Sequence, residues 1–553
     1  MNKNINTASQ STSSLPLLGQ YWRGLGGWNY YFLLKFGLLW YGYLNFHPLA
    51  NLVLVACLLL PIPNIRLHRL RHWLAVPFGI GLFYHDTWLP GIGSLLSQGD
   101  QLAGLSGTYL LELIQRFINW QMLGAAFVLW VAYLFLVQWL RFTVLVVVAL
   151  GWLNVLDMSG PAMKLLPVVE QPMAGRQFDK PKAASDMVSP ADIPATNQNL
   201  NAALDAFYQR EQQRQTRFPN SLPADAVPFD LLVINICSLS WSDLEAVKLA
   251  SHPVWQRFDI RFQDFHSATS YSGPAGIRLL RASCGQSAQQ ALYKPADPRC
   301  YLFDNLAQLG FGTQLAMDHD GDFGGYLTDL RQHGNMQAPL MSQQGISRAL
   351  VSFDDEPVLN DAQLFSRWLR QRQADGDTRS ATFFNLIPLH DGNRLPGKNE
   401  TAPYRDRALD LFDQLDAFFE QLEQSGRRLM VVVVPEHGAA LVGDKVQLSG
   451  LRDIPSPSIT RVPVGIKLFG MQAPHRGPAL EIETPSSYLA ISELIARLVD
   501  GRQFEAEAVD WQALTRGLPQ TAAVSENDNA VVMEFQGDSY IRLNQGDWVP
   551  YPR

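Results

Sequence analysis

The feature that most constrains the fold is the uneven distribution of apolar residues along the 553-residue chain. Before about residue 160 the sequence is dominated by Leu, Val, Phe and Trp, whereas polar and charged residues reach globular frequencies after it. A chain this long exceeds one hydrophobic core, so two or three domains are expected. The net charge of −7 argues against a nucleic-acid-binding protein, because such proteins usually carry a basic face.

Apolar stretches in the first part predict a helical membrane domain. Residues 1–20 are polar and lack the apolar segment of a cleavable signal peptide, so the domain is expected to stay attached. The stretch Trp120–Leu140 has the length of about 20 residues that a spanning helix needs. The stretch Leu49–Ile62 is short and Trp73–Leu89 contains Pro77, so the alternative is that one of these two forms a re-entrant or buried helix. The five stretches are Tyr30–Phe46, Leu49–Ile62, Trp73–Leu89, Trp120–Leu140 and Phe142–Met158.

Basic residues predict the orientation of this domain. Arg23, the cluster at 66–71 and Arg141 fall on one side of a five-span arrangement, which the positive-inside rule makes cytoplasmic. The loop 90–119 and everything after residue 158 then lie outside the cytoplasm. The predicted division is a cytoplasmic segment (1–27), a membrane domain (28–159), an extracytoplasmic linker with a short amphipathic helix (160–225) and a soluble domain (226–553).

Strong β-runs alternate with helical stretches in the soluble domain. The clearest are Phe229–Cys237, Ala381–Pro388 and Leu429–Pro435, which are nearly continuous apolar runs, as strands buried on both faces of a parallel sheet must be. Between the last two, Tyr404–Gly426 shows helical periodicity. The alternation predicts a doubly wound α/β fold with a mostly parallel sheet, in which ligands bind beyond the carboxyl ends of the strands.

Three strand ends carry chemistry. The first strand ends in Cys237, the second is followed by His390, and the third is followed at once by Glu436 and His437. A thiolate, a carboxylate and an imidazole suit Zn²⁺ and disfavour Mg²⁺ or Ca²⁺. Each residue alone has a more ordinary explanation. A buried Cys usually serves as a small apolar residue, an acidic residue after a strand often caps a helix, and a His is more often a packed side chain than a ligand. Their convergence on one sheet edge favours a metal site.

The soluble domain has three cysteines, of which two should pair in an oxidising compartment. Cys284 and Cys300 bracket a short polar loop, and closing it could stabilise the domain by about 3 kcal/mol. Cys237 is then the odd thiol, which a bound metal would keep reduced. Pairing through Cys237 is the alternative and requires that residue to leave the strand end. Cys57 lies in an apolar stretch and is interpreted as a packing residue.

Ser272 is the candidate nucleophile. It precedes Gly273–Pro274 and an apolar helical run, a pattern typical of a helix start. The N–H groups and dipole of a helix N-terminus suit a phosphoryl oxygen, although a serine here can simply cap its helix. A metal-bound serine differs, because the metal stabilises the alkoxide needed for attack at neutral pH.

These motifs resemble a known family over essentially the whole chain. The chain is similar to the cellulose phosphoethanolamine transferases of enterobacterial cellulose synthesis systems, which belong to the alkaline phosphatase superfamily. The most specific blocks are LLVINICSLSWSD, SATSYSGPAGIRLLRASCGQ, PLHDGN, VVVVPEHG and SGLRDIPSPSIT.

The resemblance implies a set of roles. Ser272 would form a covalent phosphoethanolamine–serine intermediate, and Cys237, Glu436 and His437 would hold zinc with Ser272 completing the shell. Compared with lipid A phosphoethanolamine transferases, Cys237 replaces a Glu and Glu436 replaces an Asp, which leaves one or two zinc ions as alternatives. His390 would transfer protons or bind phosphate, and Tyr271 and Arg452 would contact the substrate.

The same resemblance implies the substrates and the location. The donor would be phosphatidylethanolamine, the acceptor the glucose 6-hydroxyls of nascent cellulose, and the partners the subunits of the cellulose synthase complex. The membrane domain would lie in the bacterial inner membrane, with the linker and the catalytic domain in the periplasm. The alternatives are a zinc phosphodiesterase of the same fold, with water as the acceptor, and a non-catalytic membrane scaffold.

Overall fold

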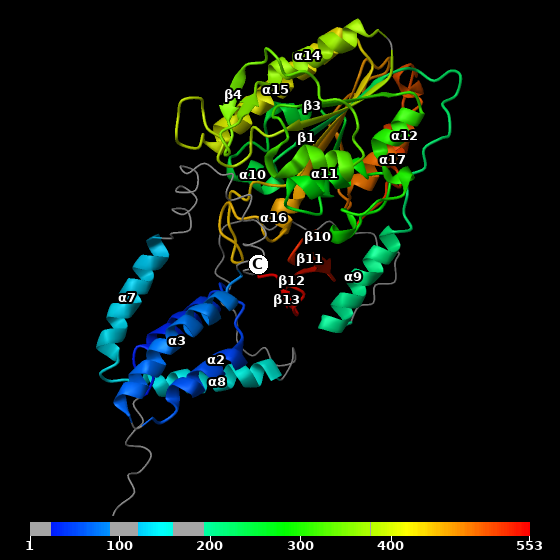
Figure 1. Ribbon diagram of the computed structural model, residues 1–553. Coiled ribbons are helices and arrows are strands. Elements are labelled where there is room, and N and C mark those ends of the chain that lie inside the picture. Colours follow the sequence, from blue (N-terminus) through cyan, green and yellow to red (C-terminus); the bar gives the residue numbers. More distant parts are fainter. Residues whose placement is uncertain (1–23, 63, 89–119, 159–192, 377, 553) are drawn as a thin grey trace, which may run out of the picture. The chain divides into compact units, whose positions relative to one another are not determined.

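The computed structural model describes the chain except for residues 1–23, 63, 89–119, 159–192, 377 and 553. It divides into two compact units, one made of residues 1–89 and 118–184 and the other of residues 90–117 and 185–553. The loop at 90–119, predicted to face outward, lies outside the described residues. In Figure 1 the described helices of the first unit are blue to cyan, and the second unit runs from green to red.

The first unit is helical, with one helix in each of the five predicted apolar stretches. Within the part of the chain that the structure describes, no helix combines the length and the apolar content needed to cross a membrane. Pro77 lies inside its helix, which also includes the basic residues predicted to form a loop. The helices are α1 (Trp28–Trp40), α2 (Pro48–Leu59), α3 (Ile65–His85), α7 (Trp120–Leu136) and α8 (Phe142–Met158).

A buried polar cluster joins three of these helices. Lys35 of α1 donates to Asn51 of α2 at 2.7 Å and lies 2.5 Å from a carboxylate oxygen of Asp86, just after α3. Asn51 also donates to Asp86 at 2.6 Å. All three side chains are fully buried, so the cation and the anion need each other to remain charged.

The second unit is built on a seven-stranded sheet in the order β3-β6-β1-β7-β8-β2-β9. The prediction of a mostly parallel sheet is confirmed, because β3, β6, β1 and β7 are parallel and only β8 runs antiparallel to both neighbours. The strands are β1 (Asp230–Ile236), β2 (Ile260–His266), β3 (Gly312–Met317), β6 (Ser380–Leu386), β7 (Leu429–Pro435), β8 (Arg461–Phe469) and β9 (Leu480–Ile482); a separate pair is β4 (Arg348–Val351) and β5 (Pro357–Leu359).

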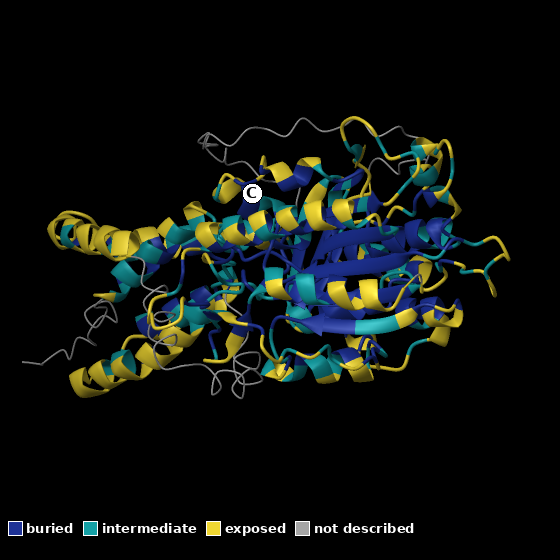
Figure 2. Ribbon diagram, turned by 90° about the horizontal axis from the view of Figure 1, so that it is seen from above, coloured by how far each residue is buried: buried dark blue, intermediate teal, exposed yellow. Residues whose placement is uncertain are grey.

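Helices cover both faces of this sheet, as a doubly wound fold requires (Figure 1). Every residue of β1, β6 and β7 is buried, which explains their nearly continuous apolar sequences (Figure 2). One face packs against α10 (Trp241–Ala246), α14 (Asp361–Ala374) and α15 (Tyr404–Ser425). The other packs against α11 (Ser272–Leu280), α12 (Leu302–Gln308), α13 (Tyr326–Gln332) and α17 (Tyr488–Leu498), and the short helices α16 (Pro457–Thr460) and α18 (Trp511–Thr515) complete the unit.

A small antiparallel sheet follows at the C-terminal end of the chain. Its strands pair in sequence order, and their apolar side chains pack against α9 (Asn197–Glu211). The amphipathic helix predicted at Leu200–Arg214 is therefore present, and its apolar face belongs to the core of the second unit. The strands are β10 (Val524–Asn527), β11 (Ala530–Phe535), β12 (Asp538–Leu543) and β13 (Trp548–Pro550).

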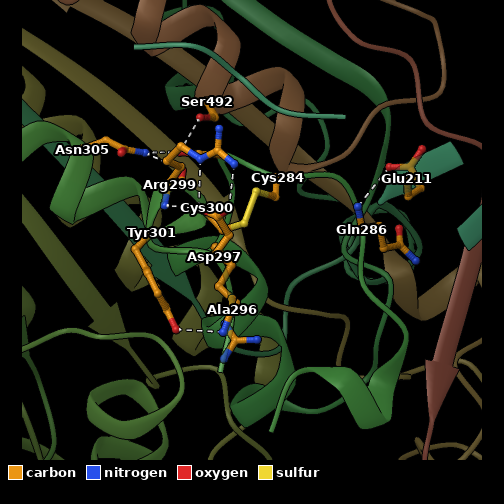
Figure 3. Close-up of a disulfide and its surroundings, with 12 residues drawn as sticks. Glu211, Cys284, Gln286, Ala296, Asp297, Arg299, Cys300, Tyr301, Asn305 and Ser492 are labelled. Atoms are coloured by element: carbon orange, nitrogen blue, oxygen red, sulfur yellow. Dashed lines mark hydrogen bonds and ion pairs between the residues drawn. A yellow bond between two sulfur atoms is a disulfide. The ribbon is translucent and has the colours of Figure 1, made fainter. Parts of the chain in front are cut away.

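A disulfide joins Cys284 to Cys300, with 4.9 Å between the two Cα atoms (Figure 3). It lies just beyond the C-terminal end of α11. Beside it, Asn305 donates to Ser283 and to the Arg299 carbonyl, so the loop is held by hydrogen bonds as well. The bridge therefore ties down the helix whose first residue is Ser272. Cys57 and Cys237 are not in this bridge.

Candidate active site

The ends of three neighbouring parallel strands bring the predicted site residues to one edge of the sheet. Strand β1 pairs with β6 on one side and β7 on the other, and Ile236 lies opposite both Leu386 and Pro435. Cys237 directly follows the end of β1, and Glu436 and His437 directly follow the end of β7. In-register strands thus place Cys237 and Glu436 opposite each other, with His437 one residue further along.

Ser272 lies against this edge. Its Oγ is 3.4 Å from Cys237 Sγ and 3.3 Å from His437 Nε2, and Sγ lies 3.9 Å from the same Nε2. Ligand atoms of Cys237, Glu436 and His437 all lie within 4.8 Å of one another, and the three residues are buried. A thiol, a carboxylate, an imidazole and a hydroxyl therefore converge on one small space.

Glu436 provides the test of whether this space suits a cation. Its Oε1 accepts from Asn385 Nδ2 at 2.6 Å and from Tyr326 Oη at 3.2 Å. Its Oε2 is buried, and among the described residues it has no hydrogen-bond partner. An orphaned carboxylate oxygen is costly to bury, so an oxygen in this position favours a bound cation. The donor set of sulfur, nitrogen and oxygen suits zinc.

The imidazole of His437 is oriented for the same purpose. Its Nδ1 lies 3.0 Å from the Gly438 carbonyl, so Nδ1 carries the proton and Nε2 presents a lone pair to Cys237 and Ser272. Burial, and then the charge of Arg452, hold the pKa of His437 well below its usual range, so the ring is neutral at pH 7. Burial raises the pKa of Cys237 to about 12, and the nearby Glu436 carboxylate adds to this. A metal would displace the thiol proton.

Ser272 is the first residue of α11 rather than its cap. Tyr271 occupies the N-cap position and makes no side-chain capping hydrogen bond. The N-terminus of this nine-residue helix therefore lies beside the strand-end cluster, and its dipole would favour a phosphoryl oxygen there. Ser272 is therefore not the N-cap of α11, which was the alternative to a nucleophile in the sequence.

Arg452 and Tyr271 border the cluster. Arg452 Nη1 lies 3.2 Å and 3.4 Å from the two ring nitrogens of His437, and 3.4 Å from Ser238 Oγ. Tyr271 Oη donates to Asp453 Oδ1 at 2.8 Å. The cation of Arg452 thus lies beside the His437 ring, where a phosphate near the cluster would meet a positive charge, whereas the Tyr271 hydroxyl is engaged with the loop that carries Arg452.

His390 lies in the loop after β6. Its Nδ1 is 2.8 Å from the Asp391 carbonyl, and its ring stacks on Phe353 with 4.2 Å between centroids. Burial, followed by the charge of Arg452, lowers the pKa of His390 to about 3. Among the described residues no direct hydrogen bond joins His390 to Cys237, Ser272, Glu436 or His437. It is a neutral imidazole whose Nε2 is the acceptor.

Asn527 was not predicted, although it joins the two loops that carry Ser272 and Arg452. Its Oδ1 accepts from Thr269 Oγ1 at 3.0 Å and from the Ser270 N–H at 3.3 Å. Its Nδ2 donates to Ser270 Oγ at 2.7 Å and to the carbonyls of Arg452 and Asp453 at 3.2 and 2.9 Å. It is buried at the end of β10, so the small C-terminal sheet contributes directly to the site. An Asn-Asp-Asn stretch in the sequence indicates only a turn.

Asp243 holds the loop after β7 in a similar way. Its carboxylate accepts from the N–H groups of Ala439 and Leu441 at 2.7 and 3.1 Å, and also caps α10 through Ser240. Ser238 and Ala440, in the two strand-end loops, have φ values of 63° and 56°. Left-handed non-glycine residues are strained, and they cluster here next to Cys237 and His437.

Comparison with known proteins gives a consistent result over both units. Residues 28–155 match the family described as the N-terminal domain of the cellulose biosynthesis protein BcsG, and residues 185–548 match its C-terminal domain. The BcsG proteins of Salmonella typhimurium and Escherichia coli are 60% and 58% identical, and each alignment covers 99% of this chain and 100% and 99%, respectively, of the relative.

Solved structures show more distant similarity. An alkaline phosphatase superfamily protein from Vibrio parahaemolyticus aligns with 13% identity and a TM-score of 0.44, covering 64% of this chain and 91% of that one. The integral membrane lipooligosaccharide phosphoethanolamine transferase A of Neisseria meningitidis aligns with 11% identity and a TM-score of 0.36, covering 55% of this chain and 62% of that one.

Proposed function

Because the chain belongs to the BcsG family of cellulose biosynthesis proteins, we propose that it transfers phosphoethanolamine from phosphatidylethanolamine to glucose 6-hydroxyls of cellulose. The observation that carries this proposal is the placement of Ser272 Oγ within 3.4 Å of both Cys237 Sγ and His437 Nε2. A structural serine at a helix start does not need a buried thiol, imidazole and carboxylate around its hydroxyl.

The proposed transfer takes two displacement steps at phosphorus, and different residues act in them. In the first, Ser272 Oγ bonds to phosphorus, the bond to the glycerol oxygen breaks, and diacylglycerol leaves with the serine proton. In the second, the sugar oxygen bonds to phosphorus, the bond between phosphorus and Ser272 Oγ breaks, and Ser272 regains the proton that the sugar hydroxyl has lost. Arg452 and the N-terminus of α11 bind the phosphoryl oxygens, and His390 Nε2 accepts the proton of the sugar hydroxyl.

Cys237, Glu436 and His437 would hold one zinc ion, with Ser272 as the fourth ligand. The ion would supply charge that favours the Ser272 alkoxide over the alcohol. The buried Asn385 and Tyr326 keep the Glu436 carboxylate in place through its other oxygen.

The first unit would anchor the protein in the bacterial inner membrane, with the second unit in the periplasm beside the synthase subunits. Large apolar side chains on its helices, including Trp73, Phe127 and Phe135, face outward rather than into a core. Surfaces of this kind are normally covered, and a lipid layer would cover them. Reporter fusions should place residues 64–72 in the cytoplasm and residue 200 outside.

The test replaces Ser272 with alanine in the full chain. The matched control is Ser287→Ala, at a serine in the loop that follows α11. Diacylglycerol release and phosphorus NMR of the polysaccharide are measured together. Ser272→Ala should abolish both signals while the control keeps them, and mass spectrometry of the wild type should find phosphoethanolamine on Ser272. Release without modified polysaccharide in the wild type would indicate a phosphodiesterase, and full modification by Ser272→Ala would refute the covalent mechanism.

A further inference from the structure

A cavity of about 440 Å³ adjoins the proposed centre. The loop after β6 lines one side with Leu389, Asp391 and residues 401–404, and the loop after β7 lines the other with Ala439, Leu441 and residues 449–450. Two of these residues flank His390, and Ala439 lies two residues after His437. The cavity is therefore formed by the same strand-end loops that carry the reacting groups.

The wall of the cavity is connected to the centre by a hydrogen bond. Tyr404 Oη donates to the carbonyl of Ser238 at 2.7 Å, and Ser238 follows Cys237 directly. On the cavity wall, the Arg407 guanidinium lies 5.7 Å from the Tyr404 ring and donates to the carbonyls of Pro388 and His390. The same residues thus shape the cavity and hold the loop of His390, so a molecule in the cavity lies next to the centre.

Three exposed aliphatic side chains lie in the two loops that line this cavity and are called the aliphatic rim: Leu395, Val442 and Leu448, which are 50%, 57% and 39% exposed. Each is next to the lining. Val442 follows Leu441, Leu448 precedes Ser449, and Leu395 follows Arg394, which pairs with Thr401 across the loop. Both loops that line the cavity therefore present apolar side chains to solvent, next in sequence to lining residues or to a residue paired with one.

The chemistry of the rim fits a phospholipid surface better than a protein or a glucan. Its three members are aliphatic, whereas protein interfaces are enriched in Tyr, Trp and Arg, and sugar rings stack on aromatic faces. Lys398 and Lys445 are exposed in the same two loops, with Glu400 as an opposing charge. Lysines beside aliphatic groups can extend their amines to lipid phosphates while the aliphatic groups enter the acyl layer.

We propose that the aliphatic rim inserts into the outer surface of a phospholipid layer, and that the cavity takes the glycerol-ester region of the lipid donor. This inference rests on the proposed function, and it names the side of the site from which the donor enters. The lining is suited to that region, because Ala402, Pro403 and Leu441 offer apolar contacts to the start of the acyl chains.

The experiment uses the full chain in phosphatidylcholine nanodiscs and the triple variant Leu395→Ser/Val442→Ser/Leu448→Ser. The matched control is Ile193→Ser/Tyr293→Ser, two similarly exposed side chains outside the rim. Diacylglycerol release is measured from long-chain phosphatidylethanolamine in the disc and from soluble dihexanoyl-phosphatidylethanolamine. We expect the rim variant to lose about tenfold or more with the long-chain donor and to stay within about twofold with the soluble donor.

A second readout does not depend on activity. A polarity-sensitive dye on Val442→Cys should shift to the blue in discs, and the same dye on Ile193→Cys should not. Equal losses with both donors, unchanged rates with both, or a dye that stays in water would overturn the lipid-facing rim. Loss of polysaccharide modification in cells with full activity in discs would also overturn it and indicate a protein partner. A wild type that cleaves neither donor would instead count against the proposed function, with the dye still reporting on the rim.

Discussion

Replacing Asn527 with alanine removes the side chain that joins the Ser272 loop to the Arg452 loop. The change leaves the Thr269 hydroxyl and the Ser270 N–H, both fully buried, without their acceptor. Each unsatisfied buried group costs about 1–3 kcal/mol, so the loss of stability for the two groups should be about 2–6 kcal/mol. Ser270 precedes Ser272 by two residues, and a displacement of about 1 Å in the nucleophile costs about a hundredfold in rate.

The assay combines kinetics, metal content and thermal unfolding. Asn527→Ala should lower kcat for phosphoethanolamine transfer by about 30- to 100-fold, with a much smaller change in KM. Zinc content should stay at the wild-type level, because Cys237, Glu436 and His437 come from β1 and β7. Asn527→Asp should be worse, since a carboxylate oxygen would face the carbonyls of Arg452 and Asp453.

The control is Asp528→Ala, which alters the exposed neighbour in the same turn and should leave kcat and Tm unchanged. Wild-type kcat in Asn527→Ala would refute the reasoning, because the two loops would then hold Ser272 and Arg452 without the amide. A parallel fall in zinc content would also refute it, since the effect would then be a general loss of the site.

Three further predictions concern the metal, the disulfide and pH. Cys237→Ser should lower zinc in the purified full chain from about one ion per chain, and unchanged elemental analysis would contradict the ligand role. Cys284→Ser/Cys300→Ser should cost about 3 kcal/mol, seen as a lower Tm that reducing agent does not lower further. Burial, and then the charge of Asp410, raise the pKa of Asp361 to about 8, above the unfolded value of 3.8. The folded protein then holds a proton that the unfolded chain has lost between these pH values, so stability falls as pH rises through that window, by up to about 1.4 kcal/mol per pH unit. Asp361→Asn should remove this slope in Tm measured from pH 5 to 8, and an unchanged slope would exclude Asp361 as its source.

The strands that deliver the candidate site could be predicted from the sequence, because burial on both faces leaves a continuous apolar run. The predicted strand Leu429–Pro435 is β7 as observed, and the other two differ from β1 and β6 by one or two residues at their ends. Parallel strands in one sheet end at one edge, so Cys237, Glu436 and His437 could be grouped from their positions alone. Five helices in the first unit follow from the same apolar signal.

The sequence determined the strands, the apolar first unit and the residues that end the strands, since these depend on neighbours within a few positions along the chain. Only the tertiary structure decided what holds them in place. Asn527 bonds to Ser270 across 257 positions, and α9 packs on strands more than 300 residues away. The Lys35–Asp86 pair likewise joins two helices whose apolar patterns do not encode the contact. Long-range hydrogen bonds of single polar residues leave no periodic signal in the chain, because their partners are chosen by the packing of the whole fold.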